Sequence, residues 1–166
     1  TAFAALKKDG SVVSWGSSSV NDDYAGIAID TSAIDHQLQS DVISISSTAH
    51  AFAALKKDGS VVTWGRDNAG GDNSEVIDDL QSGVKKIFST YSTFLALKED
   101  GSVVVWGSAV ARGVNNQTTA FPFNGNSPFI KEKISSNVKD IFVGKYGFTA
   151  LKTDGSLVVY TSGTSN

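Results

Sequence analysis

Short apolar runs separated by small polar residues dominate the hydrophobic pattern of this chain, and one such pattern occurs four times. Each copy begins with Phe, continues through Ala-Leu-Lys to an Asp-Gly-Ser centre, and ends with a second apolar run that closes in Trp or Tyr. The copies span residues 3–15, 52–64, 94–106 and 148–160. Two strand-like runs around Asp-Gly are typical of a β-hairpin with a tight primed turn, in which both central residues adopt positive φ. The sequence therefore predicts four equivalent β-hairpins.

A second pattern precedes the last three hairpins. Val and Ile stand ten and seven residues before the leading Phe, as Val42/Ile45, Val84/Ile87 and Val138/Ile141. Each pair predicts a third strand that joins its hairpin. Farther upstream, the segments 32–38, 74–80 and 127–134 have apolar residues four apart and begin with Ser, so we expect short helices that are N-capped by Ser and cover the edge of a sheet. Pro128 suits the first position of the third helix.

The repeat predicts the fold class. A sheet of three strands and one short helix cannot bury both of its faces, whereas stacked copies can. We therefore predict a mainly β, β-propeller-like array of four hairpin blades with short connecting helices, in a single repeat domain over residues 1–166. The aromatic residues that begin and end each hairpin motif are interpreted as packing between blades. They are Phe3, Trp15, Phe52, Trp64, Phe94, Trp106, Phe148 and Tyr160. The alternative is that the Trp series forms a row on which a ligand stacks.

Four units do not complete a typical propeller, and only three of them have the upstream strand. We expect an array that is incomplete as a single-chain ring and that exposes apolar sheet faces at its ends. Three arrangements would cover these faces. The chain, which lacks Met and starts at Thr1, can be a piece of a longer propeller. It can close as a small four-bladed ring, or its N-terminal end can dock onto the C-terminal end of another copy, which gives a ring or a filament.

The motif Ala-Leu-Lys-x-Asp-Gly-Ser-Val-Val-x-Trp-Gly resembles the repeat of the regulator of chromosome condensation family, which has many bacterial members. Gly70-Gly71-Asp72 after Trp64-Gly65 is similar to the Gly-rich segment that follows Trp-Gly in that family. The resemblance implies a propeller, usually of seven four-stranded blades, and work in protein interaction, including nucleotide exchange on a small GTPase and chromatin docking. The variable segments 16–31, 65–73 and 107–126 match none of the family's exchange or histone-binding residues, so none is assigned.

Composition excludes several kinds of chemistry. The 166 residues include no Cys, and their formal net charge is −3, which gives no reason to expect nucleic acid as a partner. No segment predicts insertion in a membrane. The two histidines, His36 and His50, occupy unrelated positions, so we expect neither a metal site nor a catalytic triad. Short acidic segments such as 22–23 and 67–73 lack the spacing of a calcium loop and are expected to be solvated turns.

The long insert between the third and fourth hairpins contains the candidates for a partner surface. Aromatic and amide side chains in a long loop are typical of protein contacts. These candidates are Arg112, Asn115, Asn116, Phe121 and Phe123.

The sequence as a whole predicts a non-enzymatic structural or protein-interaction module, without cofactors, that self-assembles head to tail or belongs to a larger propeller. A lectin-like, carbohydrate-binding surface module is the alternative hypothesis. The absence of sulfur and the abundance of small polar residues favour a secreted or cell-surface location over the cytoplasm.

Overall fold

The structure is a computed structural model that describes residues 2–16, 31–107 and 128–161. Within these ranges the chain is mainly β, with eleven strands and a few short helical turns. The strands are β1 (Ala2–Leu6), β2 (Val12–Gly16), β3 (Val42–Ser47), β4 (Ala51–Lys56), β5 (Val61–Gly65), β6 (Val84–Ser89), β7 (Thr93–Lys98), β8 (Val103–Gly107), β9 (Val138–Gly144), β10 (Gly147–Lys152) and β11 (Leu157–Thr161).

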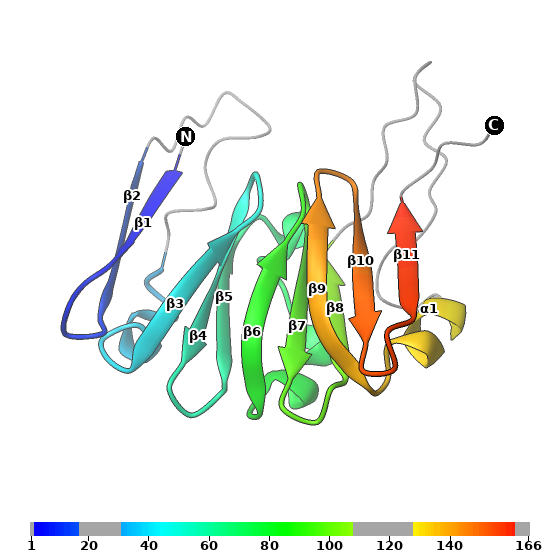
Figure 1. The fold of residues 1–166 in the computed structure, drawn as a ribbon. Helices are drawn as coiled ribbons and strands as arrows, with labels where there is room; N and C mark the ends of the chain where they lie inside the picture. The colour runs from blue at the N-terminus through cyan, green and yellow to red at the C-terminus, as the bar shows by residue number, and fades with distance from the viewer. Residues whose placement is uncertain (1, 17–30, 108–127, 162–166) are drawn as a thin grey trace, which may run out of the picture.

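The strands form four antiparallel sheets that follow one another along the chain. Their strand orders are β1-β2, β3-β4-β5, β6-β7-β8 and β11-β10-β9, called here the first to the fourth sheet. Figure 1 shows the sheets side by side in an open fan, with β3, β6 and β9 next to one another at the front. The predicted array of four hairpin blades is confirmed, and the last three blades carry the predicted third strand.

Each hairpin has the same register. The leading Phe pairs with the closing aromatic residue, as in Phe52↔Trp64 and Phe94↔Trp106, and five residue pairs join the two strands of every hairpin. Since side chains alternate between the two faces of a strand, equal register places the same repeat positions on the same face of every sheet.

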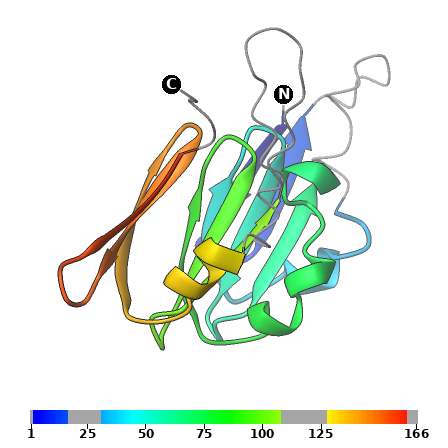
Figure 2. The ribbon, with the colours of Figure 1, turned by 90° about the vertical axis from the view of Figure 1, so that its right-hand side faces the viewer.

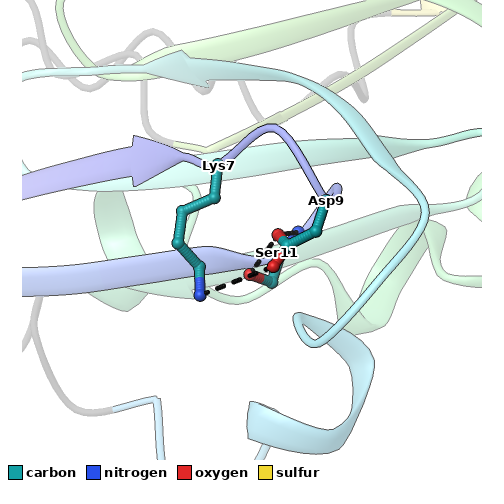
Figure 3. A network of polar contacts seen from close by, with 3 residues as sticks. All are labelled: Lys7, Asp9 and Ser11. Atoms are coloured by element: carbon teal, nitrogen blue, oxygen red, sulfur yellow. Dashed lines mark hydrogen bonds and ion pairs between the residues drawn. The ribbon is translucent and has the colours of Figure 1, made fainter.

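The Asp-Gly turns differ from the predicted primed turn. Their glycines have φ between 79° and 87°, whereas no aspartate of these turns has positive φ. In the first turn, Asp9 Oδ1 accepts hydrogen bonds from Ser11 N at 2.9 Å and from Ser11 Oγ at 2.7 Å (Figure 3). The Asp side chain therefore closes its own local turn, which leaves positive φ to Gly alone. The prediction of two positive-φ residues was wrong.

A β-bulge explains why Val and Ile of the third strand can be three residues apart and still share a face. In β3 the register shifts between Val42 and Ser44, and equivalent shifts occur in β6 and opposite Leu151/Lys152 in the β9–β10 pair. The extra residue restores the alternation, so Val42 is buried and Ile45 is partly buried, while Ile43 between them is exposed.

The short helices lie close to the predicted segments but are mostly 3-10 turns. They are η2 (Asp35–Gln37), η3 (Asp67–Ala69), η4 (Ser74–Val76), η5 (Asp78–Leu80) and α1 (Pro128–Lys133). Figure 2 shows η3, η4 and η5 gathered on one side of the fan, and η3 and η4 contact β8.

The predicted serine caps are wrong for the first two helical segments. The N-cap of η2 is Ile34, that of η4 is Asn73, and neither forms a side-chain cap bond. Each of these 3-10 turns contains only three residues, so few backbone amide groups need a hydrogen bond from a capping side chain. Pro128 does begin α1, as predicted.

Candidate interaction surfaces

Neighbouring sheets pack face to face through apolar side chains. In the contact between the second and third sheets, Ala51, Ala53 and Leu55 meet Phe94 and Trp106. We call the face that a sheet turns to the next sheet its forward face, and the opposite one its backward face. In this contact the forward face therefore carries Ala and Leu, and the backward face carries Phe and Trp.

The other two contacts follow the same rule. Leu95, Leu97 and Val103 on the forward face of the third sheet meet Phe148 and Ala150 on the backward face of the fourth. On the first sheet, the forward face supplies Ala4 and Val12, which pack against Phe52, Ala54, Val62 and Trp64 of the second sheet. Blade packing is thus one interface used three times.

The eight aromatic residues that the sequence marks for packing form four stacked pairs, each on the backward face of its sheet. Their ring centroids are 5.2 to 5.8 Å apart. The pairs are Phe3–Trp15, Phe52–Trp64, Phe94–Trp106 and Phe148–Tyr160. Trp64 and Trp106 are buried, so neither indole is open to a stacking ligand.

The Gly-rich segment after Trp64 covers the stacked pair of the next sheet. Trp106 Nε1 donates to Gly70 O at 3.1 Å in a buried hydrogen bond. A Cβ on Gly70 would lie 2.5 Å from the ring of Phe94, so only Gly lets the backbone approach this closely. The Gly70-Gly71-Asp72 segment, which resembles the Gly-rich segment of the repeat family, therefore contributes to the contact between the second and third sheets.

The backward face of the first sheet has no cover among the described residues. Phe3 and Trp15 are each 51% exposed and Val13 is 48% exposed, whereas Phe94 and Trp106 at equivalent positions are buried. Large exposed apolar groups that adjoin one another are typical of an interaction surface. We call Phe3, Val13 and Trp15 the head surface.

The forward face of the fourth sheet is exposed as well. Leu157 and Val159 are 60% and 61% exposed, while Val103 and Val105 of the third sheet are buried at the same repeat positions. Phe142 pairs with Thr149 in the register, so it shares this face, and it is 57% exposed. We call Phe142, Leu157 and Val159 the tail surface. In Figure 1 the sheets that carry the two surfaces stand at opposite ends of the fan.

Titratable groups do not form a metal-binding cluster in the part of the chain that the structure describes. It contains no group of three or more His, Asp or Glu side chains placed to hold a metal ion. His36 is exposed in η2 and His50 is partly buried in the connection between β3 and β4. Burial, and then the charge of Arg66, lower the pKa of His50. The described residues also contain no helix long and apolar enough to cross a membrane.

The predicted partner residues in the long insert, Arg112, Asn115, Asn116, Phe121 and Phe123, lie outside the described residues. Sequence reasoning did not single out Val13, Phe142, Leu157 and Val159, which complete the two end surfaces. The repeat positions of Val13, Leu157 and Val159 carry buried residues in other blades, and that of Phe142 carries the partly buried Phe88 in the third sheet. Only the place of these residues at the ends of the fan distinguishes them.

The stacked sheets define the class of this chain as an array of β-propeller blades. The chain is similar to yeast RCC1 (Prp20) in its complex with Kap60, with a TM-score of 0.55, 19% identity and coverage of 96% of this chain and 41% of the other. Prp20p of Saccharomyces cerevisiae, studied with its binding properties to Gsp1p and histones, gives a TM-score of 0.55, 20% identity and coverage of 96% and 42%. Human WBSCR16 gives a TM-score of 0.48 and 22% identity, with coverage of 96% of this chain and 45% of the other.

The particular fold is therefore that of RCC1-type propellers, as the repeat motif predicted. The chain spans less than half the length of these proteins. No family model and no curated protein sequence matches it.

Proposed function

We propose that this chain is a non-enzymatic protein-interaction module whose head surface binds the tail surface of another copy. One observation carries the proposal: the two exposed surfaces are the two halves of the contact that the chain makes three times between its own sheets. A forward face and a backward face of this repeat are complementary in chemistry and in register.

The expected affinity is modest. The six side chains of the head and tail surfaces are about half exposed, and covering each contributes about 1 kcal/mol, given about 1.5–3 kcal/mol for burying a whole apolar side chain. Association costs about 4–15 kcal/mol in lost freedom of motion. The total gain of about 6 kcal/mol exceeds only the lower end of this cost, so we expect weak, reversible association that requires a high protein concentration.

The solved structures with this fold support a role in protein binding. Yeast RCC1 (Prp20) is seen bound to Kap60, and Prp20p is described by its binding to Gsp1p and histones.

Sedimentation velocity over a range of concentrations tests the self-association. The wild-type chain should form species larger than the monomer as its concentration rises. Trp15→Asp should block the head and Leu157→Asp should block the tail, so each variant alone should stay monomeric. Mixed together, they should form a one-to-one dimer, because one intact head and one intact tail remain.

Ile77→Asp serves as the matched control. Ile77 is 45% exposed but lies between η4 and η5, away from both surfaces, so this variant should assemble like the wild type. A wild-type chain that stays monomeric at every concentration, or a mixture that does not dimerise, would contradict the proposal.

No specific observation favours the carbohydrate-binding alternative. It requires a row of accessible indoles, and of the three tryptophans only Trp15 is exposed. The alternative stays a prediction that a glycan array can test.

A further inference from the structure

Three aromatic rings, one from each of three blades, lie in a row at the rim opposite the Asp-Gly turns. The rings belong to the connections β3–β4, β6–β7 and β9–β10, which lie at the upper rim in Figure 1. The centroids of His50 and Tyr91 are 6.0 Å apart, and those of Tyr91 and Tyr146 are also 6.0 Å apart. Lys145 Nζ lies 5.7 Å from the Tyr91 centroid and 5.0 Å from that of Tyr146.

The backbone under these rings is tied across the blades. Ala49 N donates to Tyr91 O at 2.9 Å, and Tyr91 N donates to Lys145 O at 3.0 Å. In the β3–β4 connection, Thr48 Oγ1 accepts from Ala51 N at 3.0 Å, and it donates to Ala69 O of η3 at 3.1 Å. The rings are therefore presented by a fixed scaffold, which lowers the entropy cost of binding.

The repeat does not account for these rings. His50 and Tyr146 stand two residues before the leading Phe of their hairpins, whereas Tyr91 stands three residues before Phe94. Tyr91 and Tyr146 are 45% and 54% exposed, so they contribute little to the packed core. Different repeat positions thus supply an aromatic side chain to one place on the surface.

Positive charge accompanies the rings. Lys145 is exposed and, like an ordinary lysine, carries a positive charge at neutral pH; its interaction with the Tyr146 hydroxyl raises its pKa. Arg66 is close enough to His50 to lower its pKa, and one carboxylate, Asp67, follows Arg66 in sequence. The turn aspartates lie at the other rim.

We propose that His50, Arg66, Tyr91, Lys145 and Tyr146, the rim patch, form a binding site for an acidic peptide segment of a partner protein. Tyr and Arg are enriched where protein interfaces gain most of their energy. Two ring separations of 6.0 Å each span at most about 12 Å, enough for about four residues of extended peptide at about 3.3 Å per residue.

A nucleic acid fits the rim patch less well. Binding to a phosphate backbone needs several cations, and the patch has two in a chain of net charge −3. Bases also need an open ring face on which to stack, and Lys145 lies close to both Tyr rings. The site does not depend on head-to-tail association, because it lies on a rim and not on a terminal sheet face.

Fluorescence anisotropy tests the site with a labelled ten-residue peptide of alternating aspartate and leucine. The peptide should bind saturably, while the same peptide with lysine in place of aspartate should not. Lys145→Glu and Tyr146→Ala should each weaken binding by at least about ten-fold. The matched controls are Lys57→Glu in an Asp-Gly turn and Ile77→Ala between η4 and η5, and each should change binding by less than about two-fold.

Amide chemical shifts give a second measurement on the wild-type chain. Peptide binding should move the signals of Ala49, Tyr91 and Lys145 more than those of the Asp-Gly turns. Absence of acidic-peptide binding would overturn the proposal, as would equal loss of binding in Lys57→Glu. Tighter binding of a labelled oligothymidylate than of the acidic peptide would overturn it in favour of nucleic acid.

Discussion

At the scale of single residues, the Asp-Gly-Ser centre forms a small hydrogen-bonded turn motif that occurs four times. In every copy the Asp Oδ1 accepts from the Ser backbone N at 2.9 Å and from the Ser Oγ at 2.6 or 2.7 Å. These bonds are stronger when the carboxylate is ionised, so they lower the pKa of Asp9, Asp58, Asp100 and Asp154. The Ser hydroxyl has the largest effect in each case.

The first prediction concerns the pKa of Asp58. Ser60→Ala removes the hydroxyl donor but keeps the backbone donor, so the pKa of Asp58 should rise part of the way toward its ordinary value of 3.8. Carboxyl carbon NMR shifts measured against pH would show this change. Asp100 in the same variant is the internal control, and its lowered pKa should be unchanged. An unchanged Asp58 would mean that the hydroxyl bond is not what stabilises the carboxylate.

The same shift makes stability depend on pH in a defined direction. Because the folded-state pKa of these aspartates lies below the unfolded value near 3.8, their contribution is fully present above that pH. It is lost as the pH falls through the folded-state pKa. The free energy of unfolding should therefore fall with acidification below pH 3.8.

At the scale of elements, a repeated lysine attaches the short helical segments to the hairpins. Lys56 Nζ donates to Gln37 O at 3.0 Å, Lys98 Nζ to Asp79 O at 2.7 Å, and Lys152 Nζ to Lys133 O at 2.8 Å. In each case the carbonyl is 19 residues upstream. The Lys of Ala-Leu-Lys therefore has a structural role in these three blades.

Lys98→Met should lower the free energy of unfolding by about 0.5–1.5 kcal/mol, since it removes one solvent-exposed hydrogen bond but keeps most of the apolar stem. Lys7→Met is the matched control. Lys7 has the same repeat position, but it forms an exposed ion pair with Asp9 at 3.8 Å, a type of contact worth about 0–1 kcal/mol. Urea denaturation of both variants measures the difference. Equal losses in the free energy of unfolding would show that the hydrogen bond from Lys98 to Asp79 O contributes nothing measurable.

At the scale of the whole molecule, the close approach of the sheets depends on the turn glycines. Gly59 O accepts from Val84 N of the next sheet at 3.0 Å, and a Cβ on Gly59 would lie 2.7 Å from Gly83 N. Gly10 and Gly101 make the same bond to Val42 N and Val138 N. The turn glycine is thus required twice, once for its positive φ and once for the neighbouring backbone.

Comparison of Gly59→Ala with Gly155→Ala separates these two requirements. Both glycines have positive φ, 80° and 87°, so each substitution should cost about 1–2 kcal/mol in backbone strain. Only Gly59 adds overlap with the next sheet, because a Cβ on Gly155 meets no atom within 4 Å. Gly59→Ala should lose about 1–3 kcal/mol more. Equal losses in urea denaturation would mean that the sheets can move apart at no cost.

The repeat allowed much of the fold to be predicted before the structure was known. Equal spacing of Phe, Asp-Gly and Trp defines the hairpins, because register within a hairpin is a local property of its turn and its alternation. The bulge, by contrast, could not be predicted from Val42 and Ile45. Residues three apart fit a helix as well as a bulged strand, and only pairing with β4 decides between them.

For the candidate surfaces, too, some features follow from the sequence and others only from the tertiary structure. By itself the sequence determined which side chains are apolar and that four units are equivalent, since both follow from the identity and spacing of residues. Tertiary structure alone decided that Trp106 is buried while Trp15 is exposed, although both close the same motif. It also brought His50, Tyr91 and Lys145 together from three separate connections. Burial and side-chain neighbourhood depend on which sheet lies next to which, and that contact is made between residues far apart along the chain.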